Sequence, residues 1–168
     1  MKYGKTIVLI LATMALSGCS NHREETVRKV RAAHYPVALA QINHTYPNSA
    51  GGVSLLMWLE NTSNKTIKYI NYKFTSYNSV GDEAPSEIDG ESQKDIKLTG
   101  PYAPGDNNFS YAKSAFVWKN VWYNNSISCV ELNSVKITYM DGSVVSIDEQ
   151  TKILGVLPAW YKNNCRVI

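Results

Sequence analysis

The three cysteines are the residues in this 168-residue chain whose chemistry depends most on their position. Cys19 closes an N-terminal segment in which Lys2 and Lys5 precede an apolar run over residues 7–16. A basic start, a short apolar stretch and small residues before a cleavage point are typical of a secretory signal. A transmembrane helix needs about 20 apolar residues, so this run is too short to be a permanent anchor. The segment therefore predicts export.

The residues Leu16-Ser17-Gly18-Cys19 resemble the lipobox of bacterial lipoprotein precursors. The resemblance implies cleavage after Gly18, a thioether from the Cys19 sulfur to diacylglycerol, and acylation of the new amino group. Two or more acyl chains anchor a protein firmly, whereas a single chain binds only marginally. Ser20, and not Asp, follows the cysteine, which in enteric-type bacteria implies the outer membrane over the inner one. An ordinary signal peptide with an accidental cysteine is the alternative.

The two remaining cysteines, Cys129 and Cys165, would then lie in an oxidising compartment. We expect a disulfide between them that ties the end of the chain to the body of the domain. Two buried free thiols are one alternative. A reactive cysteine nucleophile is another, although no histidine lies near either cysteine in the sequence.

Other groups that could do chemistry are better explained by ordinary structural roles. The three histidines, His22, His34 and His44, lack the close ligand spacing of common metal sites. The carboxylates of residues 82–95 are read as a solvated acidic loop and not as a Ca²⁺ site, because the EF-hand spacing is absent. No nucleophile elbow, phosphate loop or dinucleotide turn occurs. We therefore predict no catalytic residue, no metal and no cofactor.

Aromatic side chains offer a possible binding surface. Most tryptophans in such domains pack in the core or between strands. Trp122 and Tyr123 stand in a polar stretch that looks like a structured corner, residues 120–125, and are the best candidates for a surface contact with a glycan or peptide.

Net charge argues against nucleic acid as a partner. The formal charge of the whole chain is +3. Lys2 and Lys5 leave with the signal, so the mature protein carries only +1. A nucleic-acid-binding domain is normally far more basic.

The elements that must position these residues are mostly strands. We divide the chain into a cleaved signal over 1–18, a lipidated N-terminus and solvated polar tether over 19–33, and a β-domain over 34–168. Alternation of apolar and polar residues predicts strands over 35–42, 53–60, 66–78, 108–118, 127–140 and 143–147. The second and third are expected to form one hairpin and the last two another, turned by Asp141-Gly142. The stretch over 151–156 suits either a helical turn or a strand.

Six to eight short strands with frequent turns predict an all-β antiparallel sandwich, with a small β-barrel as the alternative. Four fragments, 61–69, 77–82, 121–124 with Cys129, and 137–142, together resemble small immunoglobulin-like bacterial domains of uncharacterised function. The resemblance covers about residues 53–147 and implies a sandwich fold, but no catalytic residues.

These observations favour a lipid-anchored envelope protein on the periplasmic face of the outer membrane. We expect it to act as a non-enzymatic interaction or structural module, held to the membrane through Cys19, with a protein or glycan partner. The alternative is an inhibitor or immunity protein whose acidic loop, 82–95, plugs a periplasmic enzyme. A hydrolase is a third class, and it would need a cleft with perturbed carboxylates.

Overall fold

The computed structural model describes residues 22–108 and 114–166. Two helices and seven strands follow one another along the chain. In order they are α1 (His22–Ala32), β1 (Val37–His44), β2 (Gly52–Asn61), β3 (Ile67–Asn78), β4 (Gln93–Tyr102), β5 (Phe116–Tyr123), β6 (Ile127–Tyr139), β7 (Val144–Ile147) and α2 (Gln150–Val156).

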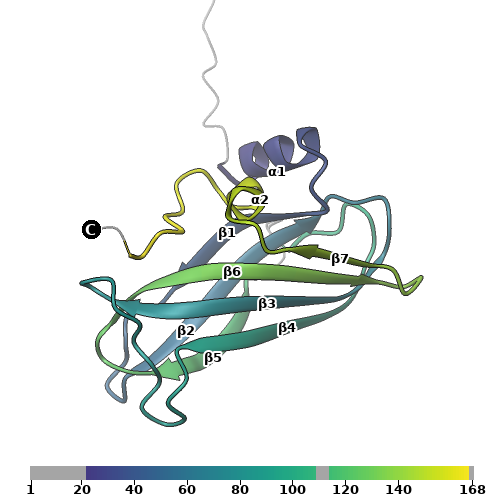
Figure 1. Cartoon of the computed structure of the whole chain (residues 1–168). Coiled ribbons are helices and arrows are strands. Elements are labelled where there is room, and N and C mark those ends of the chain that lie inside the picture. Colours follow the sequence, from purple (N-terminus) through teal and green to yellow (C-terminus); the bar gives the residue numbers. More distant parts are fainter. Residues whose placement is uncertain (1–21, 109–113, 167–168) are drawn as a thin grey trace, which may run out of the picture.

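The strands form two antiparallel sheets that pack face to face (Figure 1). One sheet has the order β1-β2-β5 and the other β4-β3-β6-β7. This arrangement confirms the predicted immunoglobulin-like sandwich, and the barrel alternative is wrong because neither sheet closes on itself. Pro36 directly precedes β1, which lies at a sheet edge, where a residue without an N–H group is tolerated.

The core lies between the sheets and follows from strand alternation. Every second residue of β2 is buried in it, namely Val53, Leu55, Met57 and Leu59. The facing strand β3 contributes Ile70, Tyr72 and Phe74. Since successive strand residues point to opposite faces, this period-2 pattern fixes which face turns inward.

The predicted hairpin between residues 53–60 and 66–78 is wrong. β2 and β3 belong to different sheets, so the turn after β2 crosses the sandwich. Asn61 supports the crossing, because its side-chain Nδ2 donates to the carbonyls of Lys65 and Tyr102 at 2.9 Å each. Both strands carry apolar residues that pack across the core, and a short polar link between two apolar strands does not distinguish a hairpin from such a crossing. The hairpin of β6 and β7 is confirmed.

The region before β5 also differs from expectation. A strand was predicted over 108–118, but β5 begins at Phe116, and residues 109–113 lie outside the described part of the chain. The expected corner over 120–125 is largely the second half of β5. A register shift opposite Val53 and Leu55 interrupts the pairing with β2 there, and Asn120 adopts a positive φ of 53°.

The solvated tether predicted before residue 34 is wrong for residues 22–32, which form α1. Val27 and Val30 are buried against Ala38 and Ala40 on the outer face of β1. Two alanines leave room for a helix to approach the sheet, and the valines, three residues apart, share one helix face. The charged composition suggested solvent exposure, but three buried positions are enough to dock the helix.

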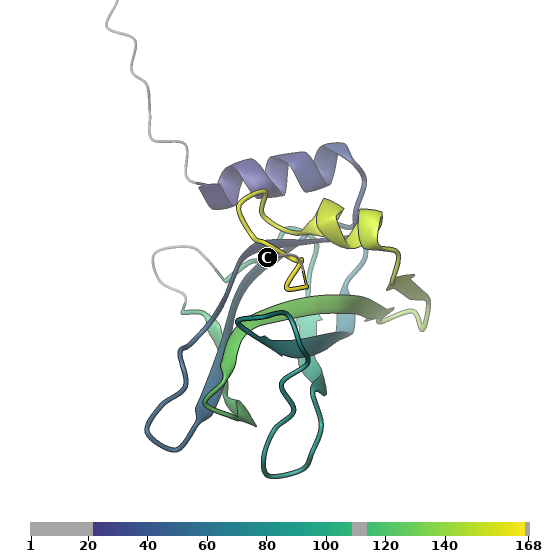
Figure 2. The same cartoon turned by 60° about the vertical axis from the view of Figure 1, so that its left-hand side comes forward.

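The second helix closes the open side of the sandwich. Ile153 and Val156 of α2 join the main core, and Figure 2 shows α2 lying beneath α1. Gly155 allows this close approach, since a Cβ atom there would lie 2.4 Å from the ring of Tyr35. Of the two interpretations of residues 151–156, the helical one is correct.

Candidate functional site

The lipidation candidate, Cys19, lies outside the described residues, but the described chain begins close to it. Only Ser20 and Asn21 separate Cys19 from the start of α1 at His22. Neither helix within the described ranges is long and apolar enough to cross a membrane.

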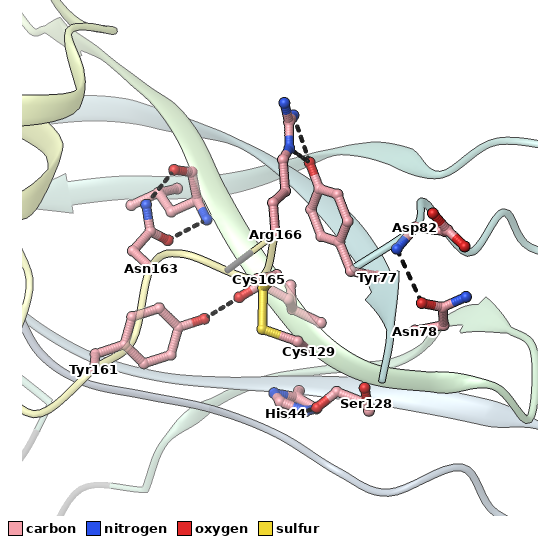
Figure 3. Close-up of a disulfide and its surroundings, with 12 residues drawn as sticks. His44, Tyr77, Asn78, Asp82, Ser128, Cys129, Tyr161, Asn163, Cys165 and Arg166 are labelled. Carbon is pink, nitrogen blue, oxygen red and sulfur yellow. Dashed lines mark hydrogen bonds between the residues drawn. A yellow bond between two sulfur atoms is a disulfide. The ribbon is translucent and has the colours of Figure 1, made fainter. Parts of the chain in front are cut away.

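The predicted disulfide is confirmed. Cys129 on β6 is bonded to Cys165, 36 residues later, with their Cα atoms 5.8 Å apart. The bond fixes the C-terminal segment, residues 157–166, against one end of β6 (Figure 3). We call this segment the strap.

The strap takes the place of a strand along β6. β7 pairs with β6 only from Val135 to Thr138, which leaves the rest of that edge without a strand partner among the described residues. Asn163 fills part of the gap, because its Oδ1 accepts from the Leu132 N–H at 2.6 Å and its Nδ2 donates to the Leu132 carbonyl at 2.8 Å. The Tyr161 hydroxyl donates to the Val130 carbonyl at 2.5 Å. The strap thus satisfies backbone groups that an edge strand leaves open.

Further along, the strap covers polar groups on the outer face of the sheet. The Arg166 guanidinium donates to the Tyr77 hydroxyl from Nε at 3.0 Å and from Nη2 at 2.7 Å, and Tyr77 is only 1% exposed. Glu131, 9% exposed, has one carboxylate oxygen with no hydrogen-bond partner in the described structure. Burial, and next the nearby charge of Glu131, raise the pKa of Tyr161. The strap is therefore held to the sheet by specific polar contacts.

The fold brings one histidine to this corner, although none is near in sequence. His44 Nε2 lies 3.2 Å from the carbonyl oxygen of Ser128, the residue before Cys129 (Figure 3). Burial lowers the pKa of His44, and the hydrogen bond to Ser128 opposes that shift in part. Because both cysteines are engaged in the disulfide, this corner holds no thiol nucleophile.

A second polar site lies between α1 and the outer face of β2. A hollow of about 280 Å³ is lined by Glu24, Val27, Arg28, Arg31 and Glu60. Arg31 pairs with Glu60, whose side chain is almost fully buried. Burial raises the pKa of Glu60, and the hydrogen bond and charge of Arg31 oppose this shift. The pair joins the end of α1 to β2, so its first role is to hold the helix in place.

An arginine–tryptophan contact extends this site toward the start of α1. The Arg23 guanidinium lies 4.6 Å from the ring centroid of Trp58, and its Nε donates to Gln41 Oε1 at 2.7 Å. A cation over an indole ring is attracted by the negative face of the ring. Three arginines of α1, Arg23, Arg28 and Arg31, and Trp58 of β2 therefore gather along this site.

The proposed aromatic contact at Trp122 is wrong. Trp122 is 0% exposed in the core, and its indole Nε1 donates to the Ser92 carbonyl at 2.8 Å. A buried tryptophan normally finds such a partner for its N–H. Of the polar neighbours that suggested exposure, Asn124 and Asn125 lie beyond the end of β5, and Asn120 has a positive φ. Tyr123 is half-buried at the end of the strand, where its carbonyl accepts from the Glu87 N–H at 2.8 Å.

That last bond belongs to the acidic loop, which is more ordered than expected. Ala84 and Ser86 are buried, and the Ser76 hydroxyl donates to the Ala84 carbonyl at 2.7 Å. Asp89 is ion-paired with Lys94, which lowers the pKa of Asp89. Residues 93–102, partly assigned to this loop, form β4. Within the described residues, no three histidine, cysteine or acidic side chains gather closely enough to hold a metal ion.

Sequence patterns missed the strap and the arginine sites. Asn163 and Arg166 stand in a short tail with no periodicity, and only the position of Cys165 between them signalled that the tail is held. The i,i+4 spacing of Glu24 with Arg28 and of Glu25 with Lys29 was the signal for a helix over 22–32.

No protein-family model and no curated protein sequence matches this chain significantly. Among solved structures, a hypothetical protein from Peptoclostridium difficile 630 aligns with a TM-score of 0.46 at 11% identity, covering 72% of this chain and 91% of that one. A DUF1425 family member from Shewanella sp. pv-4 aligns with a TM-score of 0.32 at 22% identity, covering 60% and 75%. Neither similarity carries an argument about function.

Proposed function

We propose that this protein is a lipid-anchored component of the bacterial envelope that binds a partner without catalysing a reaction. The observation that carries the proposal is the position of α1. The helix starts three residues after Cys19 and is docked on the sandwich through Val27 and Val30. A lipid on Cys19 would therefore hold the sandwich close to the bilayer with little slack.

The short connection gives the domain an orientation. Three residue steps join Cys19 to His22, and three steps span at most about 11 Å. The start of α1 would lie near the lipid head groups. The loop between β3 and β4 lies on the opposite side of the sandwich from both helices (Figures 1 and 2). The surfaces furthest from the membrane are then loops and sheet edges, which suits a binding module.

Replacement of Cys19 by serine tests the anchor. The Cys19→Ser protein should move from the membrane fraction to the soluble periplasmic fraction, because the thioether can no longer form. Cys165→Ser is the matched control, since it removes a cysteine that carries the disulfide, and its product should stay with the membranes. If Cys19→Ser also stays with the membranes, the anchor proposal fails.

A second candidate function is inhibition of an incoming periplasmic enzyme. The order of the β3–β4 loop favours it, because Ser86 is buried while Ile88 at the loop tip is 69% exposed. Ile88 is an apolar residue at the tip of this loop, between Glu87 and Asp89. Because the loop is already ordered by its contacts with the sandwich, it can enter a cleft at low entropic cost. Ile88→Asp should abolish capture of such an enzyme from its producer, and Val80→Asp, on an exposed neighbouring turn, should not.

A further inference from the structure

Neither described helix covers the middle of the outer face of the four-stranded sheet. Both helices lie along the side of the sandwich formed by β1 and β7, and neither covers the middle of β3, β4 and β6 (Figures 1 and 2). In β3, Tyr69 and Asn71 point outward, since Ile70 and Tyr72 between and after them are buried in the core.

Lysines lie on both sides of Asn71. Lys97 of β4 and Lys136 of β6 stand directly opposite Asn71 on the two neighbouring strands. Directly paired residues on adjacent strands have Cα atoms about 5 Å apart. The two lysines therefore bracket Asn71 in a single row across the sheet. Both are exposed.

Two ammonium groups converge on the ring of Tyr69. Lys97 Nζ lies 3.9 Å from the ring centroid and Lys68 Nζ lies 5.3 Å from it. The ring attracts each cation. Because both ammonium groups gather at one ring, an anion bound beside that ring would be attracted by both charges.

These lysines have no ion-pair partner among the described residues. Lys73, the next outward residue of β3, differs because Asp95 lies 3.9 Å from it. We call Lys68, Tyr69, Asn71, Lys97 and Lys136 the lysine face. It carries three unpaired positive charges around one aromatic ring and one amide.

We propose that the lysine face binds an anionic glycan chain of the envelope, with a sugar ring on Tyr69 and carboxylates or phosphates at the lysines. The partners of Tyr69 on the adjacent strands are Thr99 and Thr138, so the residues paired with it carry hydroxyl groups. The buried core of a protein–protein interface is rich in aromatic and apolar anchors, and this face offers a single ring. Its polar groups suit sugar hydroxyls. The inference rests on the proposed envelope function and names the class of its partner.

Titration of the mature lipidated protein in detergent tests the proposal. The probes are polygalacturonate, its fully methyl-esterified neutral form, and inorganic polyphosphate. We expect polygalacturonate to bind at low ionic strength, the neutral form not to bind, and polyphosphate to bind more weakly because it has no sugar ring for Tyr69. Binding should weaken with added salt, since exposed charges are screened.

Variants locate the site. Lys97→Gln and Lys136→Gln should each weaken polygalacturonate binding by about three- to fivefold, as expected for one exposed charge contact. Lys119→Gln removes an exposed lysine from β5 in the other sheet and should leave binding unchanged. No binding to polygalacturonate at low salt, equal binding of polyphosphate, or equal weakening by Lys119→Gln would each overturn the proposal. Membrane retention through Cys19 is measured separately, so the envelope proposal stands or fails independently.

Discussion

The side-chain amide of Asn163 makes both backbone hydrogen bonds of Leu132 that an adjoining strand would otherwise make, at 2.6 Å and 2.8 Å. A single side chain thereby stands in for a peptide group at the edge of β6. The residue is 2% exposed, so neither bond can be replaced by bulk water without opening the strap.

Asn163→Ala should lower the free energy of unfolding by about 2–3 kcal/mol, because it leaves a buried N–H and a buried C=O without partners. Urea unfolding followed by tryptophan fluorescence measures this. Asn164→Ala, at the exposed neighbouring position, is the matched control and should change stability by less than about 0.5 kcal/mol. Equal effects of the two substitutions would show that the Asn163 bonds contribute nothing.

The disulfide should stabilise the fold by restricting the unfolded chain. For a separation of 36 residues, the chain-entropy treatment gives about 3–4 kcal/mol. Cys129→Ser, Cys165→Ser and the double variant should lose similar amounts, since each breaks the same bond. If the double variant loses as much stability as the two single variants together, this expectation is contradicted. Peptide mapping without reductant should recover Cys129 and Cys165 in one linked species.

Docking of α1 depends on two valines. Val30→Ala removes two buried methyl groups and should cost about 2 kcal/mol, the transfer term plus a small cavity. Ala32→Ser, on the exposed side of the same helix, serves as the control. Limited proteolysis should cleave the Val30→Ala protein faster after Arg28 or Lys29. If cleavage rates match the wild type, α1 is not held by this contact.

Stability should fall as the pH drops below the ordinary histidine pKa of 6.5 because of His44. Its pKa is below the ordinary value of 6.5 in the folded protein, chiefly through burial. The unfolded state therefore binds more protons than the folded state in this range, and stability rises with pH. The contribution is fully present above the unfolded pKa and is lost as the pH falls through the folded value. His44→Gln should flatten the pH dependence of the urea midpoint, whereas an unchanged slope would contradict the assignment.

Strand positions were largely predictable, because alternation in β2, β3 and β6 follows burial directly. The partner of each strand was not. The link at Asn61 has the composition of a hairpin turn, and only packing of β2 across the core from β3 decides that it crosses the sandwich. Sheet pairing depends on contacts far apart in sequence, which local patterns do not encode.

The candidate sites likewise include some features that the sequence predicts and others that depend on contacts distant in sequence. The Cys129–Cys165 bond followed from counting thiols, whereas the burial of Trp122 could not be read from its polar neighbours. The docked α1 escaped detection because only three of its residues are buried, Thr26, Val27 and Val30. The lysine face depends on strand register, which places Lys97 and Lys136 beside Asn71 from positions 26 and 65 residues further along the chain.

The central claim, that Cys19 anchors the protein, is tested most directly by mass spectrometry of the N-terminus of the membrane-extracted protein. Trypsin should release a peptide of residues 19–23 whose cysteine carries diacylglycerol and whose amino group is acylated. No peptide from residues 1–18 should accompany the mature form. A mature chain whose N-terminal peptide contains unmodified Cys19, or begins at another residue, would contradict the account.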